Sequence, residues 1–165
     1  VIDRCRLSLQ LDEGRLEPKL ETVDISLVLK DLLLTCHEPQ RMVFNETSSN
    51  LTRTDEQLFR VILHNLFDNA VKYSATDSSV TISTQACDSD GVEGICLTVQ
   101  NHTTRLPATD PEILFEKYFR GANATGQTGS GLGLHLSRRL AAIINGRLWA
   151  ELVPGTVKLL LWIPN

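Results

Sequence analysis

Four polar side chains near the middle of this 165-residue chain have the types and spacing of a site for a charged ligand. Asn65, Asn69 and Tyr73 recur every four residues, which places them on one face of a helix, and Lys72 flanks that face. An amide oxygen can ligate a hard cation such as Mg²⁺, an ammonium group can meet a phosphate, and a phenol ring can lie against a base. The combination indicates a nucleotide-phosphate site built on a helix.

The helix that must position these side chains is predicted by the apolar residues before them, which recur at helical spacing from about residue 55 onward. These apolar residues are Leu58, Val61, Ile62 and Leu66. Polar groups that continue such a buried face cost about 1–3 kcal/mol each unless they are paired. The amides of Asn65 and Asn69 are therefore satisfied either inside the fold, with Lys72 as a solvated helix end, or by a polar ligand.

A glycine-rich run precedes another predicted helix, which extends to about residue 144. The run consists of Gly129, Ser130, Gly131, Leu132, Gly133 and Leu134. Its backbone N–H groups and the helix dipole suit phosphate oxygens. A dinucleotide-binding turn would need a strand immediately before the glycines, whereas a polar loop precedes them here, and the chain contains no P-loop motif. We interpret the run as the hinge and phosphate cradle of a lid.

Composition is that of one globular domain. The chain is 42% hydrophobic and 22% charged, and its formal net charge of −4 without any Lys/Arg run argues against a nucleic-acid partner. No apolar run approaches the roughly 20 residues of a membrane span. Its 4 cysteines lack metal-ligand spacing and are expected to be reduced apolar fillers of a cytoplasmic domain, which a larger membrane receptor could carry.

A helix is also predicted earlier in the chain, with Asp24 as its N-cap. Its expected inner face consists of Leu27, Val28 and Leu32, with Leu29 and Cys36 as further candidates. His37 and Glu38 follow the helix just before Pro39. A phosphorylated histidine would be expected on an exposed helix rather than at a helix end, so His37 is interpreted as a surface C-cap residue.

Strand patterns complete the fold prediction. Residues 80–84 and 94–100 alternate between apolar and polar side chains and are expected to form a hairpin in the middle of a sheet. Further strands are expected at residues 42–44, 148–153 and 157–162. The chain is therefore predicted to be an α+β protein, a two-layer α/β sandwich in which a mixed sheet of about five strands carries three main helices on one face.

Three of these features occur in an order that resembles a known family. The helix end at residues 65–73, the segment at 115–120 and the glycine run at 129–134 resemble the catalytic ATP-binding domain of bacterial sensor histidine kinases. That domain belongs to the superfamily of gyrase, heat-shock chaperone, histidine kinase and mismatch-repair ATPases. The resemblance covers about residues 20–163 and implies a Bergerat-type ATP-binding fold.

The resemblance also implies how the chain is divided. Residues 1–14 would be the tail of the preceding dimerisation helix, and residues 15–23 a connector. Residues 24–165 would be the catalytic ATP-binding domain, with a lid at about residues 101–131.

Individual roles follow from the resemblance alone. Asn69 would ligate Mg²⁺ with Asn65 on the metal or phosphates, Lys72 would meet the phosphates, and Tyr73 would flank the adenine. Arg120, Lys117 and the glycine run from Gly129 to Leu134 would close over the triphosphate. Gyrase-like relatives carry a Glu that activates water where this chain has Asn65. An amide cannot act as a general base, so Asn65, Lys72 and Arg120 favour phosphoryl transfer over hydrolysis.

One loop departs from the family pattern. Asn101, Thr103 and Arg105 stand where the family usually has Asp-x-Gly-x-Gly. The Asn101 amide can still accept a hydrogen bond from the adenine amino group, but without the charge, a loss of about 1–2 kcal/mol. Arg105 would either compensate by reaching a phosphate or obstruct the pocket.

The resemblance implies a protein-histidine kinase of a two-component system that uses ATP and Mg²⁺. Its phosphoacceptor would be a histidine on the dimerisation helix of the same homodimeric protein, and its further partner a response regulator. It would be the cytoplasmic domain of a bacterial sensor anchored in the inner membrane. The alternative is a degenerate regulatory module with weak or no nucleotide binding that acts through dimer or partner contacts.

Overall fold

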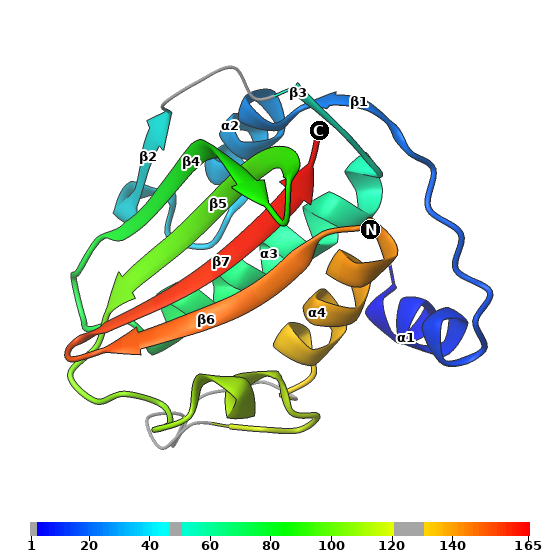
Figure 1. Ribbon diagram of the computed structural model, residues 1–165. Helices are drawn as coiled ribbons and strands as arrows, with labels where there is room; N and C mark the ends of the chain where they lie inside the picture. Colours follow the sequence, from blue (N-terminus) through cyan, green and yellow to red (C-terminus); the bar gives the residue numbers. More distant parts are fainter. Residues whose placement is uncertain (1–2, 47–50, 121–130) are drawn as a thin grey trace.

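A five-stranded mixed sheet forms one layer of the computed structural model, which describes residues 3–46, 51–120 and 131–165 (Figure 1). The sheet contains β2 (Met42–Glu46), β4 (Val80–Ser89), β5 (Val92–His102), β6 (Arg147–Val153) and β7 (Thr156–Pro164). Its strand order is β2-β4-β5-β7-β6. β2 pairs parallel to β4, and the other neighbours pair antiparallel. The predicted mixed sheet is confirmed.

The central hairpin joins β4 to β5 through the two residues Asp90 and Gly91. Both have positive φ angles, 56° and 81°, as in the two-residue turns whose twist matches a hairpin. The Gly91 N–H donates to Asp88 Oδ1 at 2.9 Å. This hairpin places the end of β5 beside β7 in the middle of the sheet, with Asn101 opposite Val157.

Three helices form the second layer on one face of the sheet: α2 (Ile25–Thr35), α3 (Glu56–Tyr73) and α4 (Gly133–Ile143) (Figure 1). Asp24 is the N-cap of α2, as predicted, and Asp55 is the N-cap of α3, which begins where the helical pattern does. Phe59, Leu66 and Leu140 are among the fully buried side chains between the layers. The two-layer α/β sandwich is therefore confirmed.

The inner face of α2 differs from the prediction. Leu27 is 64% exposed, whereas Val28 and Leu29 are buried. Leu27 was expected to face inward because helical periodicity does not fix the rotation of a short helix that is apolar almost all round. Packing against α3 selects the neighbouring face.

A second, two-stranded sheet pairs β1 (Glu21–Asp24) with β3 (Leu51–Thr54) in antiparallel register. Part of the expected connector is thus a strand. The sequence did not indicate this pair because the buried side chains of β3 are Thr52 and Thr54, which lack the apolar alternation of a typical half-buried strand.

The first helix, α1 (Arg4–Asp12), lies against α3 and α4. Its buried residue is Leu7, while Leu9 is exposed. Asp12 Oδ1 accepts a hydrogen bond from Arg139 Nη1 of α4 at 2.6 Å. Within the described parts of the chain, no helix is both long and apolar enough to cross a membrane.

Candidate functional site

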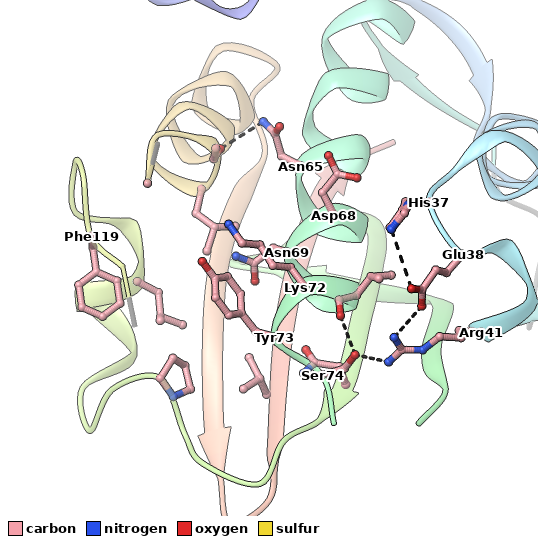
Figure 2. Close-up of a pocket in the computed structure, with 18 of the residues that line it drawn as sticks. His37, Glu38, Arg41, Asn65, Asp68, Asn69, Lys72, Tyr73, Ser74 and Phe119 are labelled. Carbon is pink, nitrogen blue, oxygen red and sulfur yellow. Dashed lines mark hydrogen bonds and ion pairs between the residues drawn. The ribbon is translucent and has the colours of Figure 1, made fainter. Parts of the chain in front are cut away.

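A cavity of about 610 Å³ lies beside the last turns of α3, between that helix and the segment that carries Phe119 (Figure 2). Cavities of about 300–1,000 Å³ are typical of sites for small molecules and cofactors. Among the residues singled out from the sequence, the cavity lining includes Asn65, Asn69, Lys72, Tyr73, Asn101, Gly131, Gly133 and Leu134. Residues from three distant parts of the chain therefore meet at one place.

The Asn65 amide is buried, with 4% of the residue exposed. Its Nδ2 donates to the carbonyl oxygen of Gly133 at 3.2 Å and to Oγ of Ser137 at 2.9 Å. Because a carbonyl oxygen can only accept, this contact fixes which side of the amide is nitrogen. The Asn65 oxygen, Oδ1, is enclosed and has no hydrogen-bond partner among the described residues. A buried acceptor without a partner fits a site for a cation or a donor ligand.

Asn69 and Tyr73 lie on the same side of α3 as Asn65 and face the Phe119 segment (Figure 2). Both are half-buried, as is Lys72, whose Nζ lies 5.2 Å from the centroid of the Tyr73 ring. Within the described part of the chain, no hydrogen bond or ion pair engages the Asn69 side chain. One amide, one ammonium group and one aromatic ring thus lie next to one another on the cavity side of a single helix.

Asn101 lines the cavity from β5, and only 2% of the residue is exposed. Its Nδ2 donates to the carbonyl oxygen of His102 at 3.5 Å, the upper limit of a hydrogen bond. Pro107 and Val157 also line the cavity. A flat, partly apolar group with a polar edge would suit these neighbours.

The two other residues that depart from the family pattern do not line the cavity. The buried Thr103 hydroxyl donates to the Arg105 carbonyl oxygen at 2.8 Å and accepts from the Arg105 N–H at 3.3 Å. The Thr103 side chain is thus used within its own loop. Arg105 is exposed and lies outside the lining, so it does not obstruct the cavity. Its contact with a phosphate stays a prediction.

The segment opposite α3 begins with the short helix η2 (Pro111–Phe115). Phe119 lines the cavity, whereas Lys117 and Arg120 are exposed and Leu132 is half-buried, all three outside the lining. Their roles in closing over a ligand stay predictions. Gly129 and Ser130 lie outside the described residues.

Gly131 holds the end of the glycine run against this segment. Its φ angle is +70°, and its carbonyl oxygen accepts from the Tyr118 N–H at 3.1 Å. A Cβ atom here would lie 2.7 Å from the Phe119 carbonyl oxygen and from the Tyr118 carbonyl carbon. Only glycine therefore fits this conformation and this close approach.

The structure adds charged residues that the sequence did not assign to the site. His37, Glu38 and Arg41 line its far side, where Arg41 Nη1 lies 2.7 Å from Glu38 Oε2 and Nη2 donates to the Ser74 hydroxyl (Figure 2). The His37 side chain is exposed, as expected, but the C-cap of α2 is Cys36 and not His37. The sequence did not indicate a place for this cluster in the site because the contacts that bring Arg41 to the end of α3, with Ser74 and Ala75, join residues more than 30 positions apart.

A second charged group lies where α1 meets the cavity. Arg4 Nη2 is 2.9 Å from His64 Nδ1 and 3.6 Å from Asp68 Oδ2. His64 Nδ1 is in turn 3.0 Å from Asp68 Oδ2. Asp68 directly precedes Asn69, so its position in the motif was the one signal that could have indicated a place in the lining.

Residues 54–165 match the family profile described as histidine kinase-, DNA gyrase B- and HSP90-like ATPase. This match covers more than half of the chain. The chain therefore belongs to this family of ATPases.

Curated relatives agree with this assignment. The adaptive-response sensory kinase SasA of Rippkaea orientalis is 31% identical over 152 residues, which cover 82% of this chain and 38% of that protein. The sensor histidine kinase AruS of Pseudomonas aeruginosa is 32% identical over 149 residues, which cover 79% of this chain and 14% of that protein. The chain thus spans well under half the length of these relatives.

Solved structures share the fold. The Acinetobacter baumannii histidine kinase AdeS superposes with a TM-score of 0.75 at 16% identity, over 98% of this chain and 75% of that one. Full-length ShkA in complex with AMPPNP superposes with a TM-score of 0.71 at 22% identity, over 98% of this chain and 36% of that one. The prediction of the catalytic ATP-binding domain of a sensor histidine kinase is confirmed in family and fold.

Proposed function

We propose that the cavity beside α3 binds Mg–ATP for transfer of the γ-phosphoryl group to a histidine outside this chain segment. The observation that carries the proposal is the enclosed Asn65 Oδ1, a buried acceptor without a partner among the described residues. Such an atom costs about 1–3 kcal/mol unless a ligand satisfies it. Family membership supports ATP as that ligand.

Asn69 and Asn65 are the residues that would hold Mg²⁺, because both offer amide oxygens and Mg²⁺ is commonly bound by a few protein oxygens together with substrate phosphates. When bound, the metal would neutralise phosphate charge during transfer. Lys72 would bind phosphate oxygens, and Tyr73 would lie against the base. The lid residues Lys117, Arg120 and Gly129 to Leu134 would exclude water from the triphosphate.

Transfer is favoured over hydrolysis because Asn65 occupies the position at which gyrase-like relatives carry a Glu that activates water. Asn65 already uses its N–H groups to bind Gly133 and Ser137, and an amide oxygen has no useful basicity. The site would therefore orient and stabilise the phosphates, while the acceptor histidine supplies the nucleophile. In the whole protein, that histidine would lie on a dimerisation helix, and a response regulator would receive the phosphoryl group.

Calorimetric titration of the chain with Mg–ATP and with a non-hydrolysable analogue tests the binding step. We expect saturable binding that EDTA abolishes. Absence of binding at millimolar ligand would favour the alternative, a regulatory module that acts through dimer or partner contacts. The transfer step is tested by adding a dimerisation helix that carries the acceptor histidine and following acid-labile phosphorylation of that helix.

A further inference from the structure

Two of the described cavity-lining residues carry buried polar side chains, Asn65 and Asn101. Asn65 donates both of its N–H groups to the protein, so it can only accept from a ligand. Asn101 has one long contact, from Nδ2 to His102 at 3.5 Å. Within the described residues, no other group hydrogen-bonds the Asn101 side chain. It alone of the two can both donate to and accept from a ligand.

The chemistry of the ligand decides which part of a nucleotide suits Asn101. Phosphate oxygens only accept hydrogen bonds, so they would leave the Asn101 oxygen unpaired. A purine edge carries donors and acceptors side by side, and the apolar groups of Pro107 and Val157 beside Asn101 suit a planar ring. Asn101 is therefore the residue that would read the base.

An amide can pair with either kind of purine at position 6. With adenine, Oδ1 would accept from the 6-amino group and Nδ2 would donate to a ring nitrogen. With guanine, Nδ2 would donate to the 6-oxo group and Oδ1 would accept from the N1–H. A carboxylate held opposite position 6 has only acceptors, so there it would accept from the 6-amino group of adenine and repel the 6-oxo group of guanine.

We propose that Asn101 makes this site accept both 6-amino and 6-oxo purine nucleotides, a substrate class that includes ATP and GTP. The proposal rests on nucleotide binding at the same cavity. The weak contact to His102 supports it, because rotation of the amide between its two pairings breaks no strong hydrogen bond.

The test is calorimetric titration of the chain with the Mg²⁺ complexes of non-hydrolysable ATP, GTP and UTP analogues. We expect the ATP and GTP analogues to bind within about tenfold of each other, because each purine can make two hydrogen bonds to one amide. The smaller pyrimidine ring should bind more weakly than either. In Asn101→Asp, affinity for the ATP analogue should rise by about five- to thirtyfold, and affinity for the GTP analogue should fall by at least about tenfold.

The control is Asn45→Asp, which adds the same charge at an exposed position outside the cavity and should leave both affinities unchanged. An inosine triphosphate titration needs no variant: it retains the 6-oxo and N1–H groups, so it should bind the native chain within about threefold of GTP.

The outcomes distinguish base selectivity from the proposed function. Binding of the ATP analogue with GTP and inosine analogues at least about a hundredfold weaker would overturn the proposal on base selectivity and leave the proposed function standing. An unchanged preference in folded Asn101→Asp would equally overturn the role of Asn101. Failure of every nucleotide to bind would overturn the proposed function itself.

Discussion

Asn65 of α3 donates a hydrogen bond through Nδ2 to the Ser137 hydroxyl of α4 at 2.9 Å, while its own Oδ1 has no partner among the described residues. The nitrogen side of one amide therefore joins two helices, and the oxygen side is the one that the proposed function assigns to a ligand. This division explains how a polar residue can continue a buried helix face. It also means that a mutation of Asn65 alone would mix a loss of stability with a loss of binding.

Ser137→Ala separates these two contributions. Removal of the buried hydroxyl leaves Asn65 bound to Gly133, so we expect a loss of about 1 kcal/mol in the free energy of unfolding and little change in nucleotide affinity. Asn65→Ala should lower the free energy of unfolding by about 1–3 kcal/mol and should also weaken nucleotide affinity by at least about tenfold. Denaturant unfolding and calorimetry measure the two quantities. Equal losses of affinity in the two variants would contradict a ligand role for the Asn65 oxygen.

Asn69→Ala tests whether the Asn69 amide helps to bind Mg²⁺. The described protein gives this amide no hydrogen bond, so its removal should leave stability within about 0.5 kcal/mol of the native value. Mg²⁺-dependent nucleotide binding should be lost, and the residual affinity should no longer respond to EDTA. Asn45→Ala, at an exposed position, is the matched control. Calorimetry that finds Asn69→Ala as tight and as Mg²⁺-dependent as the native chain would refute the assignment.

Gly131→Ala tests the contact between the glycine run and the opposite segment. Gly14 is a matched control because its φ angle is similar, +64° against +70°, but a Cβ there would meet no atom within 4 Å. Gly14→Ala should cost about 1–2 kcal/mol for the left-handed conformation alone. Gly131→Ala should cost more and should also weaken nucleotide binding, because residues 118 and 119 must move. Equal unfolding free energies for the two variants would contradict this close approach.

Two neighbouring arginines of α4 hold different segments. Hydrogen bonds from Arg139 to Asp12 on α1 and from Arg138 to Glu112 on η2, at 2.6 and 2.7 Å, hold the pKa of each carboxyl below its usual range. A depressed pKa means that each contact stabilises the fold above the unfolded pKa and is lost as the pH falls through the folded one.

We therefore expect Arg139→Ala to return the pKa of Asp12 to its ordinary range and to speed hydrogen exchange in α1 only. Arg138→Ala should return the pKa of Glu112 to its ordinary range and speed hydrogen exchange in η2 only. NMR titration of the carboxyl carbons and hydrogen exchange measure both effects. Faster exchange in η2 on loss of Arg139 would show that the two contacts do not act separately. An unchanged pKa of Asp12 in Arg139→Ala would contradict Arg139 as the cause of its low value.

Burial raises the pKa of the Cys96 thiol to about 11, whereas Cys5 is exposed. At pH 8 only roughly 0.1% of Cys96 would be thiolate, the reactive form. Iodoacetamide should therefore modify Cys5 first and reach Cys96 only on unfolding. The pKa of the thiol in the unfolded chain is about 8.5, so burial of the neutral thiol stabilises the fold fully below that pH. This stabilisation is lost as the pH rises from there toward 11. Mass spectrometry that finds rapid native modification of Cys96 would contradict its burial.

Features that depend on near neighbours could be predicted from the sequence. Asp55 caps α3 at the expected place, and Asp90-Gly91 turns the central hairpin. The order of Asn65, Asn69, Lys72 and Tyr73 along one helix face followed from the helical repeat. These signals are local because capping, turn conformation and periodicity involve residues within a few positions of one another.

The sequence by itself thus determined the family, the layers and the polar helix end. Only the tertiary structure decided which side of the Asn65 amide has protein partners, that the Thr103 hydroxyl bonds within its own loop, and that Arg41 meets Ser74. The orientation of an amide or hydroxyl depends on which donors and acceptors distant segments bring beside it. Those partners are fixed by how the helices pack on the sheet, and no local pattern records that packing.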